Sequence, residues 1–178
     1  LSTLFLGIGF IFISSIYTWL GPDNDTFADQ LKLPENVKLE YPQNMDSRTN
    51  FETFAKVDLS ANNQGEIRFQ LYNSFQPGLY EYDLWINSEK NGTVYLKAFE
   101  ITKEKQLSAE FLKENSRVGI LKTSGKLVKF GTQKHFTIHE GVWGKPYGAR
   151  FEVWFQSENE SEEIKLCENN YVIEGWMR

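Results

Sequence analysis

Hydrophobic and polar side chains alternate strictly over residues 148–156, whose sequence is GARFEVWFQ. One side of this segment would carry Ala149, Phe151, Val153 and Phe155, and the other would carry Arg150, Glu152, Trp154 and Gln156. Alternation with a period of two is typical of an antiparallel strand with one face in a core and one face outward. Trp154 is the exception to the pattern, because it is a large aromatic residue on the charged side.

Short segments of the same kind recur from residue 51 to the end of the chain. Strands are predicted over 67–72, 80–86, 93–102, 118–121, 127–130, 136–139, 164–167 and 171–177. With the segment at 148–156, these short strands and their regular turns predict an all-β fold. The predicted architecture is an antiparallel β-sandwich, jelly-roll-like, over residues 51–178.

The connections between these segments carry their own signals. Gln-Pro-Gly at 76–78 predicts a turn, because proline fixes one φ angle and glycine frees the next. Asn-Gly at 91–92 favours a hairpin turn before the strand at 93–102, which is apolar on both sides and is expected to lie centrally. Residues 108–116 are the one helical insert predicted in this region, with Ser108 as its N-cap.

The N-terminal segment differs from the rest of the chain. Residues 1–20 contain no charged side chain, and as a helix they would cover roughly 30 Å, the hydrocarbon thickness of a bilayer. We therefore predict a transmembrane helix over 1–21 and a polar linker with a short helix over 22–50. A cleaved signal peptide and the last span of a longer protein are the alternatives. Acidic residues follow the span, which predicts that the C-terminal domain lies outside the cytoplasm, in the periplasm or extracellular space.

The composition and net charge of the chain exclude several kinds of partner and site. The net charge is −5 and no basic run occurs, so a nucleic-acid partner held through phosphate contacts is not expected. Cys167 is the single cysteine, which excludes an intramolecular disulfide and a cysteine-based metal cluster. We expect it to be a small, buried apolar group.

No set of residues predicts catalysis, a metal site or another cofactor. His135 and His139 lie four apart in an alternating segment, and four strand residues span roughly 13 Å, too far for two ligands of one zinc ion. Asp23 and Asp25 resemble the start of a calcium loop, but Phe27 stands where an oxygen ligand would be needed. No nucleophile motif occurs, and nothing in the sequence selects a pair of catalytic carboxylates.

Three predicted strands each place one tryptophan among charged residues instead of among the core residues. Trp85, Trp154 and Trp176 would form a flat aromatic platform if their strands were neighbours. The charged residues predicted to share those faces are Glu81, Asp83, Arg150, Glu152, Glu174 and Arg178. Such a platform suits sugars, because C–H patches pack on the rings while hydroxyls bond to charged groups. The alternative is that the three indoles are covered by the helical insert, by a loop or by a partner subunit.

A family resemblance points in the same direction. The sequence PGLYEYDLWI at 77–86, followed by GTVYLKA at 92–98, resembles the hairpin of jelly-roll carbohydrate-binding modules and galactose-binding-like domains. In those folds a glycine turn opens a strand with an inward tyrosine, and the concave sheet often carries aromatic residues that stack on sugars. The resemblance implies a sugar-binding role for Trp85, Trp154 and Trp176. The chain departs from the family in having no acidic calcium cluster and in its N-terminal span.

The loop over 140–148 has the sequence EGVWGKPYG, in which three glycines and a proline make an unusual backbone. Trp143 and Tyr147 could rim a binding face, or Trp143 could plug the end of the sandwich. The sequence as a whole predicts a membrane-anchored, outward-facing binding module that recognises a polysaccharide or glycoconjugate. The alternative is an accessory subunit of a membrane complex, docked on a membrane-protein partner.

Overall fold

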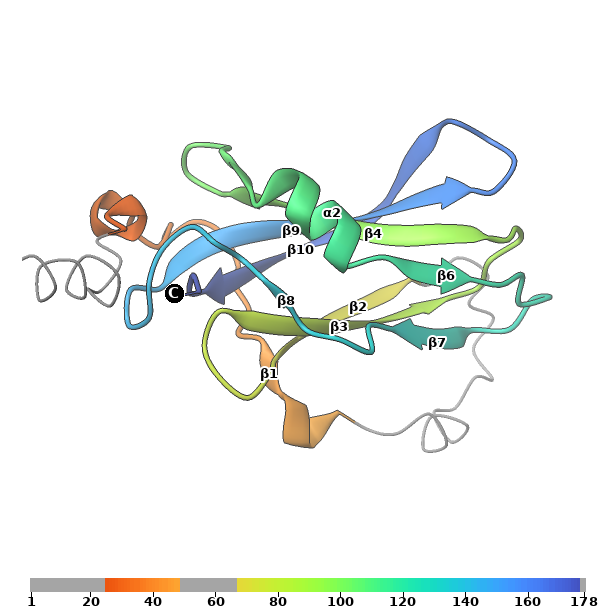
Figure 1. Cartoon of the computed structure of the whole chain (residues 1–178), viewed down its shortest axis with the longest axis horizontal. Coiled ribbons are helices and arrows are strands. Elements are labelled where there is room, and N and C mark those ends of the chain that lie inside the picture. Colours follow the sequence, from red (N-terminus) through yellow and green to blue (C-terminus); the bar gives the residue numbers. More distant parts are fainter. Residues whose placement is uncertain (1–24, 49–66, 177–178) are drawn as a thin grey trace, which may run out of the picture.

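The computed structural model describes residues 25–48 and 67–176, and in it two sheets face each other across a common core (Figure 1). The sheet around β3 contains β1 (Gln43–Asn44), β2 (Arg68–Asn73), β3 (Leu79–Ile86) and β7 (Val128–Gly131), with β8 (Phe136–Thr137) also on β3. The sheet around β9 contains β10 (Glu163–Ile173), β9 (Tyr147–Ser157), β4 (Gly92–Glu100) and β5 (Gln106–Leu107), with β6 (Val118–Ile120) also on β4. We call them the β3 sheet and the β9 sheet. The prediction of a β-sandwich is confirmed.

The core lies between the two sheets and is built from the alternating residues. On β9, Ala149, Phe151 and Val153 are fully buried, as their period of two predicts. Across from them the β3 sheet contributes Tyr80, whose ring lies 6.5 Å from that of Phe151. These aromatic contacts couple the two sheets through large buried surfaces.

Helix α2 (Ala109–Asn115) lies at the edge of the β9 sheet, between the short strands β5 and β6 (Figure 1). It replaces a strand there: the backbone N–H of Leu96 in β4 donates to the hydroxyl of Ser116 at 2.9 Å. Leu112 on the helix is fully buried in the core. The predicted helix is therefore confirmed and Ser108 stands at its N-cap position, but the predicted side-chain cap does not form. Ser108 has a left-handed backbone with φ of 44°, and its hydroxyl donates to Glu140 instead of capping the helix.

Of the two predicted turns, one forms and one does not. β2 and β3 pair in antiparallel fashion through the turn at 74–79, where Gly78 has a φ of 78°. The hairpin predicted at Asn91-Gly92 is wrong, because β3 and β4 belong to different sheets. Asn91 instead accepts a hydrogen bond from the backbone of Lys122, and a Cβ on Gly92 would lie 2.4 Å from the carbonyl oxygen of Gln156.

The strands predicted at 164–167 and 171–177 are one continuous strand, β10, paired with β9 along its length. The predicted extension beyond Ile173 is wrong, because residues 174–176 follow the strand as irregular chain. The register shifts between Lys165 and Cys167, which leaves Leu166 as an extra residue. A bulge of this kind explains why the alternation breaks in the sequence although the strand continues. β4 lies between β9 on one side and β5 and β6 on the other, which confirms the predicted central strand.

The described part of the predicted linker packs on the sandwich. It contains two short 3-10 helices, η1 (Phe27–Gln30) and η2 (Met45–Ser47), and the strand β1, which pairs in parallel with β2. Residues 25–48 are therefore part of the folded domain, because β1 adds a strand to the β3 sheet. The predicted span over 1–21 lies outside the described residues, and within residues 25–48 and 67–176 no helix has the length and apolarity to cross a membrane.

Candidate binding surfaces

The three tryptophans proposed as one platform do not lie together. Trp85 is on the outer face of the β3 sheet and Trp154 on the outer face of the β9 sheet, so the whole core separates them. Trp176 follows β10 at one end of the sandwich, where its ring meets that of Trp143 edge-on at 5.8 Å. The shared platform is therefore corrected: Trp85 and Trp154 lie on opposite outer faces of the sandwich, and Trp176 lies at one end, beyond the last strand.

On the outer face of the β9 sheet, the charged side chains hold Trp154 in place. Its indole Nε1 donates to Glu152 at 2.9 Å, and the ammonium of Lys97 lies 3.7 Å from the ring centre. Arg150 binds Glu104 through two nitrogens and Glu152 through Nε. One face of the indole is thus occupied by a cation, and the charged groups are paired with one another.

Glu163 joins β10 to β4 and α2 on the same face. Its carboxylate accepts from Lys113 at 2.8 Å and from Lys97 at 3.1 Å. The bonds from Lys113 and Lys97 lower the pKa of Glu163 from its ordinary value of 4.5 to about 2. This ion pair therefore links the helix to the sheet over a wide pH range.

Because the folded pKa is lowered, the stabilisation is complete above the unfolded value of 4.5 and is lost as pH falls toward 2. We expect Glu163→Gln to lower the free energy of unfolding by about 1 kcal/mol at pH 7, since solvent screens the pair. At pH 3 the difference should shrink. Urea unfolding of both proteins at the two pH values measures it. Glu162→Gln, at an exposed neighbouring position, is the control. A difference for Glu163→Gln that is equal at both pH values would contradict the assignment.

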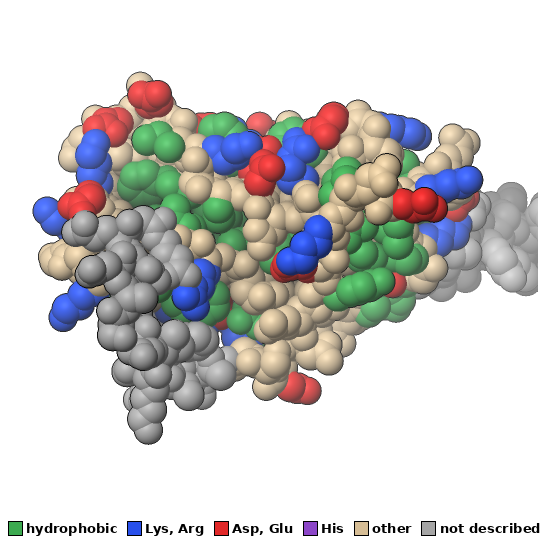
Figure 2. All heavy atoms as spheres, turned by 180° about the vertical axis from the view of Figure 1, so that it is seen from behind, with side chains coloured by type: hydrophobic (Ala, Val, Ile, Leu, Met, Phe, Trp, Pro, Cys, Tyr) green, Lys and Arg blue, Asp and Glu red, His purple; other side chains and the backbone are tan. Residues whose placement is uncertain are grey.

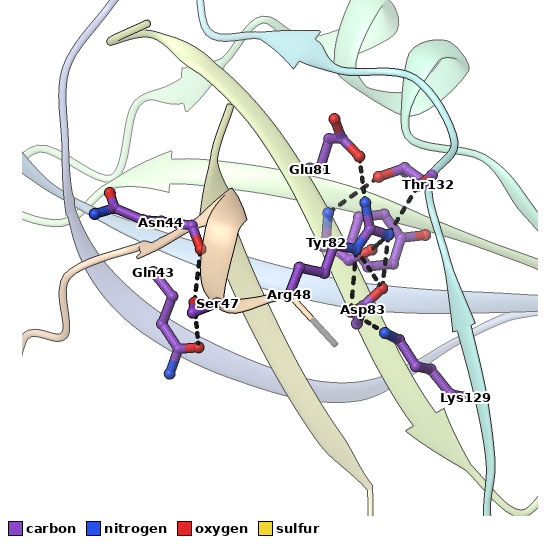
Figure 3. A network of polar contacts seen from close by, with 9 residues as sticks. All are labelled: Gln43, Asn44, Ser47, Arg48, Glu81, Tyr82, Asp83, Lys129 and Thr132. Atoms are coloured by element: carbon purple, nitrogen blue, oxygen red, sulfur yellow. Dashed lines mark hydrogen bonds and ion pairs between the residues drawn. The ribbon is translucent and has the colours of Figure 1, made fainter. Parts of the chain in front are cut away.

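The outer face of the β3 sheet holds a buried charge network around Arg48 (Figure 3). Its guanidinium donates to both oxygens of Asp83, to Glu81 and to the backbone carbonyl of Thr132. Lys129 reaches the second oxygen of Asp83 at 2.7 Å, and Asp83 itself has no exposed surface. Glu81 and Asp83 are therefore partners of cations within the protein and not open sugar ligands.

The end of the sandwich at the left of Figure 1 is closed by the 140–148 loop and the segment after β10. Tyr147 is fully buried, with its hydroxyl donating to the carbonyl of Glu140 at 2.7 Å, so its proposed place on an open rim is wrong. A Cβ on Gly175 would lie 2.2 Å from that same carbonyl oxygen, which shows how closely the two backbones approach. Trp143 packs on Trp176 with its Nε1 buried, as a plug would. Arg178 lies outside the described residues.

Beside this closed end lies a groove that the sequence did not reveal, which we call the end groove. It has a volume of about 410 Å³, within the usual range for ligand sites. Two aromatic side chains on it are unusually exposed, Tyr41 at 72% and Phe75 at 74%. Its polar lining is Asn44, Asn73, Ser74, Gln76 and Glu174.

Three separate segments position the end groove. Tyr41 precedes β1, Phe75 lies in the turn between β2 and β3, and Glu174 follows β10. Glu40 bonds to Asn170 and Val172 of β10, and Asn44 pairs with Asn73 of β2, so Tyr41 lies between these two strands. The backbone N–H of Gly144 donates to Glu174 at 2.8 Å. A hollow of similar volume, about 420 Å³, lies between β6 and β7 and has no aromatic lining residue. The one sequence signal for the end groove was Phe75, a large aromatic residue in a polar turn.

The remaining reactive side chains are held apart. His135 packs on Phe75 and His139 on Phe111, at ring distances of 5.5 and 4.3 Å. Burial raises the pKa of the Cys167 thiol to about 11, which keeps it protonated and weakly nucleophilic at neutral pH. Among residues 25–48 and 67–176, no cluster of three or more His, Cys, Asp or Glu side chains is placed to hold a metal ion.

Comparison of the chain with family models, with curated proteins and with solved structures finds no match.

Proposed function

We propose that the protein is a non-catalytic, glycan-binding β-sandwich, anchored in a membrane and facing outward, that takes its ligand in the end groove. The observation that supports this most is the pair of exposed rings, Tyr41 and Phe75, on a groove whose other lining residues include amides and a carboxylate beside prolines and aliphatic side chains. Rings of this kind pack on the C–H patches of a sugar. The amides of Asn73 and Gln76 supply both donors and acceptors for hydroxyl groups.

The end groove suits this role better than either sheet face. On the outer face of the β9 sheet, Lys97 occupies one side of the Trp154 ring. On the outer face of the β3 sheet, Arg48 covers Asp83 and Glu81. A ligand at either face would have to break ion pairs, whereas the rings of the end groove are already exposed to solvent.

The anchor and the connectivity are part of the same proposal. Residues 1–20 carry no charge and are long enough to span a bilayer as a helix. The acidic residues just after them favour an outward-facing domain. Consecutive strands β3 and β4 lie in different sheets, as they do in double-sheet jelly rolls, which favours a jelly-roll-like connectivity.

The full chain in lipid nanodiscs, applied to a glycan array, tests the function. We expect at least one oligosaccharide to bind, and Tyr41→Ala and Phe75→Ala each to weaken that binding by several-fold to about tenfold. An aromatic contact contributes about 0.5–1.5 kcal/mol beyond its burial, which corresponds to a change in affinity of this size. Both side chains are largely exposed, so the melting temperature should change little.

Phe111→Ala is the matched control, because Phe111 is a partly exposed ring on α2, away from the end groove. It should leave glycan binding unchanged. Trp154→Ala tests the sheet face directly and should also leave binding unchanged. If no oligosaccharide binds the wild-type protein, the glycan proposal fails, and the accessory subunit of a membrane complex becomes the leading alternative.

A further inference from the structure

The described chain begins at the same end of the sandwich as the end groove. Asp25 is fixed there, since one of its carboxylate oxygens accepts from the backbone N–H of Gly141 at 2.6 Å. Its other oxygen accepts from the N–H of Phe27 at 2.7 Å, and the Phe27 ring packs edge-on against Tyr147 at 5.3 Å. Lys145 adds an ion pair to η1. The start of the domain is thus held firmly to this end.

The length of chain before Asp25 limits how far this end can lie from a membrane. Five residue steps separate Leu20 from Asp25, and even fully extended they reach roughly 18 Å. β9 alone has 11 residues and extends roughly 36 Å along the sandwich. If residues 1–20 span the bilayer, the end that binds Asp25 must face the membrane and the β9–β10 hairpin must point away.

The side chains at this end suit a membrane interface. Pro146, which lines the end groove, belongs to the 140–148 loop that binds Asp25. Glu174, another lining residue, accepts a hydrogen bond from Gly144 of the same loop. Exposed Tyr41 and Phe75 lie on the end groove, and the Trp143–Trp176 pair is half-buried close by. Aromatic residues of this kind concentrate where lipid headgroups meet water. In Figure 2 hydrophobic side chains lie next to charged ones at the right-hand end of the view, and others lie at the left.

We infer that the end groove faces the bilayer and takes the sugar headgroup of a glycolipid in the same membrane. The inference rests on the proposed glycan-binding function and on the proposed anchor. A tether of at most roughly 18 Å between Leu20 and Asp25 keeps this end of the sandwich near the bilayer, which leaves room for a headgroup of a few sugars but restricts the approach of a long soluble polymer. A tether this short also gives a membrane ligand a high effective concentration at the groove.

The orientation is tested with a fluorophore on single cysteines in a Cys167→Ser background, with the full chain in nanodiscs. Lys145→Cys places the label beside the end groove, next to its lining residue Pro146, and Glu162→Cys places it in the exposed β9–β10 hairpin. Lipids with a nitroxide on the headgroup should quench the label at 145 at least about twofold more than the label at 162. Equal quenching at both positions, stronger quenching at 162, or quenching at neither overturns the inferred orientation.

The ligand source is tested with the oligosaccharide that the array identifies, coupled to phosphatidylethanolamine as a neoglycolipid. Incorporated into the same nanodisc as the protein, it should weaken binding of the free, fluorescent oligosaccharide by at least about tenfold, because its effective concentration is in the millimolar range. In separate nanodiscs at the same total concentration it should compete far less, and Tyr41→Ala should weaken the same-disc competition.

The outcomes separate this inference from the proposed function. If the free oligosaccharide binds but the same-disc neoglycolipid competes no better than the separate-disc one, the inference is overturned and the function stands. If no oligosaccharide binds in any format, both fail.

Discussion

Replacing Asp83 by alanine should lower the free energy of unfolding by about 3–5 kcal/mol, because it leaves buried cations without their shared anion. Asp83 has no exposed surface, and it bonds to Arg48 and Lys129, whose side chains are 16% and 5% exposed. Arg48 lies at the end of the segment 25–48 and attaches it to β3 through Asp83, so the loss of the Asp83 carboxylate should loosen that segment from the β3 sheet. Urea unfolding at neutral pH measures the change.

Glu168→Ala is the matched control for this network. Glu168 is 46% exposed and pairs with Lys165 at 2.9 Å, so its removal should cost less than about 1 kcal/mol. Joint replacement of Arg48, Glu81, Asp83 and Lys129 by apolar residues should recover part of the loss, since no charge of the network is then left buried without its partner. If Asp83→Ala and Glu168→Ala destabilise equally, the buried network does not hold the β3 sheet as described.

Phe151→Ala should cost about 3–5 kcal/mol, as removal of a large buried side chain leaves a cavity. Phe151 has no exposed surface, and its ring lies 5.9 Å from Tyr171 and 6.5 Å from Tyr80. It therefore contacts both sheets. The loss should appear as a lower midpoint in urea with a nearly unchanged slope, because the surface area exposed on unfolding changes little when one side chain is shortened.

Two variants put this cost in context. Ile164→Ala removes a 50% exposed residue of β10 and should cost less than about 1 kcal/mol. Glu152→Ala would cost equally little if Glu152 faced solvent unpaired, as its place in the alternation suggests. In the structure it is 6% exposed and accepts from Trp154 and Arg150, so we expect about 1–3 kcal/mol. A small cost for Phe151→Ala would contradict its place at the centre of the core.

The alternation along the chain correctly identified which side chains enter the core. Burial of one face of a strand imposes a period of two, so the signal for Phe151 and its neighbours is local and survives in the sequence. The turn at Gly78 was predictable for the same reason, because a positive φ is a local demand that glycine meets. The helix over 108–116 was also predictable from the sequence, although the Ser108 hydroxyl donates to Glu140 and does not cap the helix.

What failed was the assignment of strands to sheets. The Asn-Gly sequence before β4 suits a hairpin, yet β4 pairs with β9 across a long sequence separation. That choice depends on the packing of the whole core and not on the turn. The prediction for the tryptophans failed for the same reason. The sequence correctly placed Trp85 and Trp154 on outer faces, but their strands lie in two facing sheets, so the two side chains point in opposite directions.

The sequence by itself determined the strand content, the inward faces, the turn at Gly78 and the uncharged N-terminal segment. Only the tertiary structure decided that Asp83 is buried, because its partner Arg48 comes from a segment before β2. The end groove also depends on the tertiary structure, since Tyr41, Phe75 and Glu174 come together only when β1 pairs with β2 and the end of β10 lies beside that pair. Period and turn chemistry are properties of neighbouring residues, whereas a groove and a buried charge network are made by segments that are distant along the chain.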